Sequence, residues 1–383
     1  RNSFEIDEGD AFNELLQAKS INNLKAKNIF KKVTSNVRKG SDDSKKIIDI
    51  TIEEKPTGEI SLGAGVGTDG STIGFAVSEN NYLGKGIRLN AELRLSEEKV
   101  KGEFTVHNPN FNYSDKALDM SIYSTVTDKL ADFGYESSTA GFSFGTGFEQ
   151  YEDFFIIPKI STTYEKLETN STASNSLKKQ KGEYFDSIIT YRLNYDKRNQ
   201  SYQPTDGFLS SFVQSVPMIS DDYAILNGYD FAKYNEFGDK WNTSLSLYTR
   251  SITSLNDKDV RISKRLSLPS SKLKGFSAGK IGPLDGTDYI GGNYATSLNF
   301  TSTLPIFQTM QNADFRFFVD AGNVWGVDYS SSIDDSNKIR SSSGFAVNWY
   351  TVIGPLNFSV AKPITKASSD KTETFQFNLG TTF

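Results

Sequence analysis

The sequence contains no cysteine and only one histidine, which limits the chemistry available to it. A disulfide framework and a thiolate metal site are both excluded. The histidine, His107, lies in "VHNPNF", with no recognisable nucleophile–base arrangement around it. No phosphate-binding loop and no metal-ligand cluster is present either. We therefore expect neither an enzyme nor a protein that holds a cofactor or a metal.

Aliphatic residues are scarce, and no long apolar run exists. The hydrophobic fraction is 37%, while aromatic residues reach 13%, supplied mostly by 28 Phe and 18 Tyr. No window holds the ~18 consecutive apolar residues of a transmembrane helix, although a membrane barrel needs apolar residues only at alternate positions. Enrichment in Phe, Tyr, Ser, Thr and Asn favours β structure. The net charge of −5 gives no reason to expect a nucleic-acid partner.

Residues 1–55 mix helical and strand patterns and predict a small α+β domain. We expect Asp10 and Ser20 to cap two short helices. Two strands follow, one around 33–37 and one in "KIIDITIEE" (46–54). The order helix–helix–strand–strand suggests that a first strand is missing upstream. Because the chain begins at Arg1 without a recognisable signal peptide, we expect a fragment or a processed form.

After a linker at 56–58, marked by Pro56 and Gly58, only a period of two remains, from 59 to 383. In "GIRLNAELRL" (86–95), for example, apolar residues occupy one face and polar or charged residues the other. Sixteen such runs begin near residues 59, 71, 86, 99, 116, 138, 153, 183, 207, 221, 240, 293, 313, 340, 355 and 374.

Half-buried strands of soluble sandwiches also alternate in this way. Here, however, charged residues recur on the polar faces, and the apolar faces are rich in aromatic residues throughout. Lipid-facing apolar positions, lumen-facing polar positions and an even number of strands are typical of an outer-membrane barrel. The sequence therefore predicts a mainly β fold, a 16-stranded antiparallel transmembrane β-barrel.

The lengths of the connections predict how the barrel is oriented. On the side of the N-terminal domain the turns are short, as at 80–86 and 353–356. On the other side they are long, as at 169–182, 271–292 and 327–338. Short periplasmic turns and long external loops are the pattern of bacterial outer-membrane barrels. We therefore expect the N-terminal domain to lie in the periplasm and the barrel in the bacterial outer membrane.

Five short motifs follow one another in this part of the chain. They are "NNYLGKG" (80–86), "YDKRNQSYQPTDG" (195–207), "LKGF" (273–276), "DAGNVW" (320–325) and "TFQFNLGTTF" (374–383). In this order they resemble the motifs of the Omp85 superfamily, whose members carry [VI]-R-G-[FY] in external loop six. Each motif alone is weak, but the resemblance covers essentially the whole chain. It identifies residues 1–55 as similar to the POTRA domain that precedes such barrels, and we expect this domain to be incomplete at its N-terminus.

The resemblance implies that loop six, at 269–292, folds back into the lumen and docks on the inner wall. The residues implied in docking are Leu273, Lys274, Gly275, Phe276 and Asp320, with Gly322 and Trp325 completing the strand-13 motif. A loop packed in a lumen needs apolar anchors and glycine conformations together, and this stretch has both. A solvated loop lysine is the other interpretation of Lys274, but it would leave Phe276 and Ile281 exposed.

Asp320 has lumen-facing parity, so an ion pair between Lys274 and Asp320 is expected. The sequence departs from the family at two positions. Lysine replaces the family's arginine at 274 and cannot make its bidentate contact with a carboxylate. Asn299 stands where the family's lumenal acid is expected, which predicts a smaller network.

The first and last strands should meet at the weakest pairing of the barrel. Gly63, Gly65 and Gly67 share the lumen-facing parity of the first strand, and glycine fixes strand register poorly. We expect this weak pairing to act as a lateral gate. Its residues on the last strand are Phe375, Phe377, Leu379, Gly380 and Phe383. These glycines could instead fit tight curvature, since "GFSFGTGF" (141–148) is equally rich in glycine and lies away from the seam.

By resemblance, the function is that of an outer-membrane insertase, which folds nascent β-barrel proteins through a lateral gate between strands 1 and 16. The implied partners are nascent outer-membrane β-barrel proteins, accessory periplasmic lipoproteins and outer-membrane lipid. Two relatives of the same superfamily remain as alternatives, a polypeptide-translocating pore of the two-partner secretion type and a TamA-like assembly protein. A passive diffusion porin is disfavoured by the lumen-filling loop and the POTRA-like domain.

Overall fold

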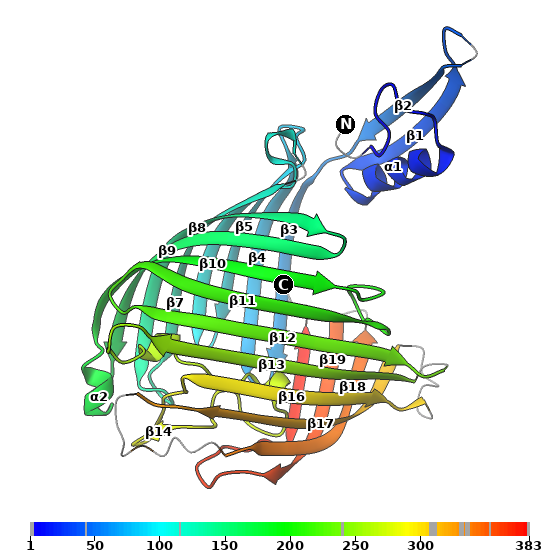
Figure 1. Cartoon of the computed structure of the whole chain (residues 1–383). Helices are drawn as coiled ribbons and strands as arrows, with labels where there is room; N and C mark the ends of the chain where they lie inside the picture. The colour runs from blue at the N-terminus through cyan, green and yellow to red at the C-terminus, as the bar shows by residue number, and fades with distance from the viewer. Residues whose placement is uncertain are drawn as a thin grey trace.

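A closed barrel of sixteen antiparallel strands makes up most of the chain (Figure 1). The computed structural model describes residues 4–380, except for 43, 115, 239–240, 306–311, 329–332, 334–337 and 352–353. The prediction of a 16-stranded antiparallel barrel is confirmed. In chain order its strands are β3 (Gly58–Gly67), β4 (Gly70–Tyr82), β5 (Ile87–Ser96), β6 (Lys99–Asn108), β7 (Ala117–Lys129), β8 (Tyr135–Tyr151), β9 (Phe154–Thr169), β10 (Gly182–Asp196), β11 (Gly207–Ser220), β12 (Ala224–Glu236), β13 (Asn242–Ser254), β16 (Tyr294–Thr303), β17 (Ala313–Trp325), β18 (Arg340–Thr351), β19 (Gly354–Thr365) and β20 (Phe375–Gly380).

The outer wall is apolar because alternate side chains of each strand point away from the lumen. On β3, for example, Ile60 and Leu62 are 73% and 77% exposed, whereas Gly63 between Leu62 and Ala64 is buried. On β18, Phe345 and Trp349 are exposed, whereas Ser342 is fully buried on the opposite face. The exposed apolar band is the surface that a bilayer would cover.

The buried apolar core lies inside the barrel, where the long connection between β13 and β16 folds back into the lumen. This connection, residues 255–293, is longer than the 269–292 predicted for loop six, and the whole of it is called loop six below. It carries two 3-10 turns, η2 (Ile262–Lys264) and η3 (Ser270–Lys272), and the short pair β14 (Leu284–Asp285) and β15 (Asp288–Tyr289). One apolar cluster joins loop six to the β7–β8 and β9–β10 connections, the latter containing α2 (Asn175–Lys178). A second cluster joins it to β16 and β17.

A small α+β unit precedes the barrel and extends from one end of it (Figure 1). It consists of α1 (Glu14–Ala26), β1 (Phe30–Lys39) and β2 (Lys46–Glu54), with β1 and β2 paired antiparallel. Its side chains touch the barrel at the β6–β7 turn, where Lys27 Nζ donates a hydrogen bond to Asn110 Oδ1 at 3.4 Å. Among the described residues, none of the helices is both long enough and apolar enough to cross a membrane.

The prediction of two short helices capped by Asp10 and Ser20 is wrong, because one continuous helix is present. Asn13 is its N-cap, and its side chain accepts hydrogen bonds from the backbone amides of Leu15 and Leu16. Ser20 lies in the middle of α1, where its hydroxyl donates to the Leu16 carbonyl at 2.8 Å. A serine that bonds the carbonyl four residues earlier does not interrupt a helix.

The N-cap can be tested by replacing Asn13 with alanine. This removes the acceptor for two amides that have no partner within the helix, and we expect a loss of about 1 kcal/mol in the stability of α1. Amide hydrogen exchange in the first turn should become faster, while exchange in the barrel strands stays unchanged. Asn13→Asp, which keeps an acceptor, is the matched control. Equal protection in Asn13→Ala and the wild type would contradict the assignment.

Candidate functional site

The pairing that closes the barrel, between β20 and β3, is the shortest strand pairing in the described part of the barrel. It comprises three residue pairs, Asn378 with Gly67, Leu379 with Val66 and Gly380 with Gly65. The β12–β13 pairing, for comparison, has thirteen. Over residues 58–64, β3 has no ladder partner on this side among the described residues. Phe383, predicted to belong to the gate, lies outside the described residues.

The external end of this seam is fastened by a side chain. The backbone amide of Thr68 donates to the Phe377 carbonyl at 2.9 Å, and the amide of Phe377 donates to the Thr68 hydroxyl at 2.8 Å. A hydroxyl therefore takes the place of a backbone carbonyl. Next to it, a Cβ on Gly67 would lie 2.7 Å from the Phe377 carbonyl oxygen, so the approach of the two strands requires glycine.

Loop six docks on the inner wall through Lys274, as the parity of Asp320 predicts. Lys274 Nζ lies 3.1 Å from Asp320 Oδ2, and the backbone amide of Lys274 donates to the same oxygen at 3.1 Å. Asp320 is fully buried. The ammonium also lies 4.5 Å from the centre of the Phe318 ring, within cation–π range. Lysine thus contacts one carboxylate oxygen, where the fork of an arginine would reach two.

Asn299, on β16, completes the contacts of Asp320. Its Nδ2 donates to Asp320 Oδ1 at 2.9 Å and to the Lys272 carbonyl at 2.7 Å. The amide therefore ties the loop backbone to the buried carboxylate without adding a second negative charge. One ammonium balances one carboxylate, which is the smaller network expected from the sequence.

Apolar side chains hold the loop on both sides of Lys274. Leu273, Phe276 and Ile281 are each at most 2% exposed. Gly275 adopts a φ of +88°, a conformation that other residues rarely adopt, and a Cβ there would lie 3.0 Å from Ala361 Cβ. Glycine at this position lets the loop backbone lie against β19.

The strand-13 motif, on β17, supports the same docking. A Cβ on Gly322 would lie 3.0 Å from Leu268 Cδ1, so glycine leaves room for the loop. Trp325 ends the strand and stacks on Tyr294, with ring centres 5.5 Å apart. The structure therefore brings the predicted loop-six and strand-13 residues together.

A second anchor, not predicted from the sequence, lies at the base of loop six and is a buried cluster of two cations and three carboxylates. Arg261 Nη1 lies 2.6 Å from Glu165 Oε2 and Nη2 lies 2.8 Å from Asp186 Oδ2, while Nε donates to Asp222 Oδ2 at 3.1 Å. Lys264 Nζ contacts Asp186 and Asp222 at 2.9 and 2.8 Å. Arg261 is 2% exposed. The only sequence signal was the lumen-facing parity of Glu165 and Asp186, which does not reveal that they converge.

Further ion pairs hold the external ends of neighbouring strands. Arg265 of loop six pairs with Asp328, beyond β17. Arg340 at the start of β18 makes a bidentate contact with Asp370, with Nε–Oδ2 3.0 Å and Nη2–Oδ1 2.9 Å. The β19–β20 connection is thereby fixed to the wall.

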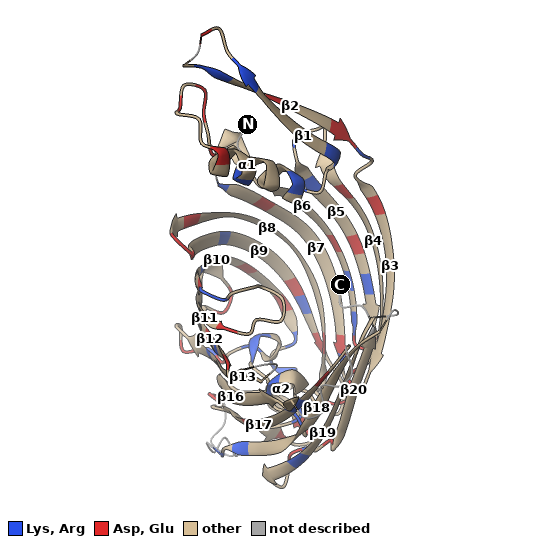
Figure 2. Ribbon diagram, turned by 90° about the vertical axis from the view of Figure 1, so that its right-hand side faces the viewer, with Lys and Arg blue, Asp and Glu red and all other residues tan. Residues whose placement is uncertain are grey.

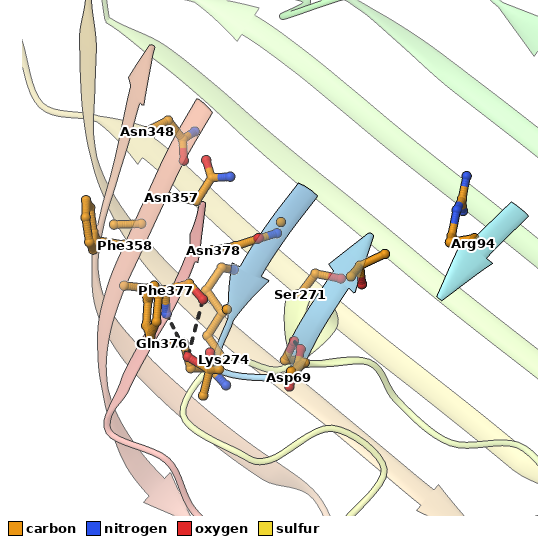
Figure 3. A pocket seen from close by; sticks show the side chains of 18 residues that line it. Asp69, Arg94, Ser271, Lys274, Asn348, Asn357, Phe358, Gln376, Phe377 and Asn378 are labelled. Atoms are coloured by element: carbon orange, nitrogen blue, oxygen red, sulfur yellow. Dashed lines mark hydrogen bonds between the residues drawn. The ribbon is translucent and has the colours of Figure 1, made fainter. Parts of the chain in front are cut away.

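Loop six also contacts both edges of the seam. On one edge, Ser270 Oγ donates to Asp69 Oδ2 at 2.5 Å, in the β3–β4 turn. On the other edge, Gln376 Nε2 of β20 donates to the Phe276 carbonyl at 3.0 Å, and the Glu373 amide donates to the Gly275 carbonyl at 2.9 Å. Between these contacts lies a cavity of about 520 Å³ on the seam (Figure 3). These hydrogen bonds between loop six and the two seam strands can form or break without any covalent step.

The contribution of the Lys274–Asp320 pair can be measured in Lys274→Ala. Removing the ammonium leaves a buried carboxylate without a cation, and breaking a buried pair costs about 3–5 kcal/mol. We expect the lower end of this range because the Lys274 side chain is 23% exposed. The folded barrel band on a gel should convert at lower temperature. Lys274→Arg should stay close to wild type, as should the control Lys366→Ala, at an exposed loop lysine. An unchanged conversion temperature in Lys274→Ala would contradict the role of the pair.

The Arg261 cluster should respond to acid. Burial of Asp222 opposes its ionisation, but the hydrogen bonds and charges of Arg261 and Lys264 outweigh this and lower the pKa of Asp222. Its stabilising contribution is therefore complete above the unfolded pKa, about 3.9, and is lost as the pH falls through the lower folded value. Amide exchange at 258–266, corrected for intrinsic rate, should accelerate only below about pH 3.9.

In Asp222→Asn the amides of 258–266 should exchange faster at neutral pH than in the wild type. The acceleration of exchange that the wild type shows in acid, to the extent that Asp222 causes it, should disappear. Acceleration of wild-type exchange at a pH well above this window would show that another group controls the anchor.

Comparison with known proteins agrees with this geometry. Residues 81–383 match the model of the Omp85 superfamily domain. The chain is 26% identical over 350 residues to the outer membrane protein assembly factor BamA of Neorickettsia risticii, covering 88% of this chain and 46% of that protein. The chain thus spans about half the length of that relative.

Solved structures show the same fold. The structure of BamA from Haemophilus ducreyi lacking POTRA domains 1–3 superposes with a TM-score of 0.89 at 24% identity, over 100% of this chain and 81% of that one. CdiB from Acinetobacter baumannii superposes less well, with a TM-score of 0.59 at 13% identity, over 99% of this chain and 70% of that one.

The family match covers most of the chain and extends to the C-terminal motif. Similarity to bacterial BamA proteins and the barrel fold indicate a bacterial outer-membrane protein. The chain belongs to the Omp85 superfamily, and its barrel is of the BamA type.

Proposed function

We propose that this protein inserts nascent β-barrel proteins into the bacterial outer membrane through a lateral gate between β3 and β20. The observation that carries the proposal is the length of the closing pairing, three residue pairs among the described residues. A membrane strand loses stability with every backbone group left without a partner, so the shortest pairing is the first to open. Similarity to BamA supports the same function.

The proposed mechanism is β-augmentation. Opening the seam exposes unpaired N–H and C=O groups on β3 and β20, and such an edge templates an added strand. The incoming strand gains main-chain hydrogen bonds while its apolar side chains enter lipid. Each further hairpin can pair with the previous one, so insertion proceeds without a covalent step or an energy-carrying cofactor.

Loop six has a mechanical role in this proposal. Its docking on Asp320 and on the Arg261 cluster fixes it to walls away from the seam. Its hydrogen bonds to Asp69 and Gln376 then support the two seam edges from inside. Release of the Gln376 bond would let β20 move at this point, while the Glu373 contact and the anchors on the wall keep the loop in place.

The N-terminal unit is proposed to be a POTRA-like domain in the periplasm. Its helix–strand–strand order and the superposition, which covers all of this chain, support this. It would receive nascent barrel proteins and accessory periplasmic lipoproteins, while the apolar outer wall contacts outer-membrane lipid. Strand addition at an exposed edge of its sheet is the mode that we expect.

A polypeptide-translocating pore is the second candidate, along with a TamA-like assembly protein. The barrel superposes better on the BamA structure, with a TM-score of 0.89, than on CdiB, with 0.59. The two functions differ in what must move. A pore requires loop six to leave the lumen, whereas an insertase requires the seam to open.

A disulfide across the seam tests the proposal. Val66 and Leu379 are direct cross-strand partners, so Val66→Cys with Leu379→Cys should lock the gate in this otherwise cysteine-free chain. We expect oxidation to stop assembly of outer-membrane barrel proteins in cells and reduction to restore it. Assembly would be scored by the folded, heat-modifiable fraction of the substrate barrel.

The matched control keeps the cysteine at Leu379 and moves its partner to Leu356, across the β19–β20 pairing. That disulfide leaves the seam free and should not affect assembly. Normal assembly with a complete Val66–Leu379 lock would rule out the lateral-gate mechanism and favour the translocating pore.

A further inference from the structure

Three asparagines form a row across the last three strands of the barrel. Asn348 of β18 lies opposite Asn357 of β19, which lies opposite Asn378 of β20, which in turn lies opposite Gly67 of β3. All three line the seam cavity, and Figure 3 shows them following one another toward β3. They face the lumen, because the alternate residues Phe345, Trp349 and Phe375 are exposed on the outer wall.

Among the described residues, the hydrogen-bonding capacity of this row is unused. Within the described part of the chain, the side-chain amides of Asn348, Asn357 and Asn378 make no hydrogen bond to another described residue. The charged groups of the cavity are already occupied: Lys274 contacts Asp320, Arg94 contacts Glu92, and Asp69 accepts from Ser270. Each side-chain amide offers two N–H donors and a carbonyl acceptor. The groups on this wall that remain able to bind an incoming segment are therefore uncharged and polar.

The strands around the row carry very little charge. β20 has no charged residue, and β3, β18 and β19 have one each, Glu59, Arg340 and Lys362. In Figure 2 these strands are largely tan, whereas the wall formed by β4–β6 carries blue and red residues. A charged ligand would find little to pair with here. The lumen-facing side of a barrel strand, with uncharged polar residues at every second position, fits this surface.

A strand added at the seam needs something to fix its register. The lumenal face of β3 presents Gly63, Gly65 and Gly67, and strands without side chains are prone to slip. An asparagine whose amide has no described partner, by contrast, favours the alignment that places a hydrogen-bonding side chain opposite it. The row ends at Asn378, on the strand whose edge is freed when the gate opens.

We propose that the asparagine row sets the register of the incoming strand. A strand that pairs with the freed edge of β20 places a lumen-facing Asn, Gln, Ser or Thr opposite Asn378, where Gly67 lies in the closed barrel. Asn378 is thus the residue that selects the alignment, and Asn357 and Asn348 extend the row behind it. The inference rests on the proposed insertase function and adds to it a rule for how substrates are aligned.

The experiment traps the incoming strand during assembly by the whole protein in cells. The protein carries Leu379→Cys, and a bacterial outer-membrane barrel serves as substrate, with single cysteines placed in turn along its edge strand. In the wild-type row one substrate position should dominate the disulfides. In Asn378→Ala the disulfide yield at that position should fall about two- to fivefold relative to the yield at positions two residues away. This is the size of effect expected from losing one cross-strand side-chain pair. Slips of two are expected because a slip of one would turn apolar residues into the lumen.

Two variants separate register from general damage. Asn378→Thr replaces the amide with a hydroxyl, which can still donate and accept a hydrogen bond, and should retain the dominant position. Asn90→Ala removes a lumen-lining asparagine on β5, away from the seam, and should change nothing. The heat-modifiable band of each variant shows that its barrel is folded.

A parallel series with Val66→Cys reports pairing at the β3 edge. Disulfides at β3 but none at β20 would overturn the register proposal and leave the insertase intact. An unchanged distribution in Asn378→Ala would do the same. If no substrate position is trapped at either edge, the proposed function fails together with the inference.

Discussion

A strand in a bilayer must be hydrogen-bonded along both edges, and among the described residues this requirement is met least well where the barrel closes. Most other pairings, such as β12–β13 and β8–β9, run through most of each strand, so removing one of them would expose a long row of amides and carbonyls. At the seam, only Gly65, Val66 and Gly67 of β3 have described partners on β20. The free energy needed to separate two strands is therefore very uneven around the barrel. The position of the candidate site follows from this unevenness.

Loop six supports the seam from inside the lumen through hydrogen bonds to Asp69 and Gln376, where few pairs join the two strands. Its apolar residues bury themselves against β16 and β17, and its cations pair with carboxylates on several walls. Buried ion pairs add little net stability, since desolvation offsets most of their attraction. They do specify geometry, because a misplaced loop would leave Asp320 or Glu165 buried without a cation. We infer that the ion pairs determine where the loop lies, and the apolar anchors supply most of the free energy that keeps it there.

Much of this architecture could be predicted from the sequence. The period of two gave all sixteen barrel strands, because lipid on one side and the lumen on the other impose alternation on each of them. Parity placed Asp320 in the lumen, and the glycine-rich, apolar composition of 271–292 indicated a packed loop. These features are local, or depend on only one neighbouring element.

Features that combine several strand registers, or a loop with the wall, were not predictable in this way. Glu165, Asp186 and Asp222 lie on the neighbouring strands β9 and β10 and in the turn after β11, but only the fold of loop six brings Arg261 to them. The asparagine row could be recognised only once the registers of the β18–β19, β19–β20 and β20–β3 pairings were known together. The residue pattern of a single strand does not contain this information. The single helix α1 was missed because a serine that would cap a helix elsewhere here bonds within it.

The threonine at the external end of the seam has a consequence for kinetics. A carbonyl acceptor is fixed by its own strand, so breaking its hydrogen bond requires backbone motion. The Thr68 hydroxyl turns about a single side-chain bond and can exchange the Phe377 amide for water while β3 stays in place. In the proposed gate, this hydrogen bond can therefore be lost by a rotamer change, which takes place in picoseconds to nanoseconds at exposed sites, while the Thr68 amide still donates to the Phe377 carbonyl. Separation of the two strands at this end then requires only this one backbone hydrogen bond to break before the Gly67–Asn378 pair is reached.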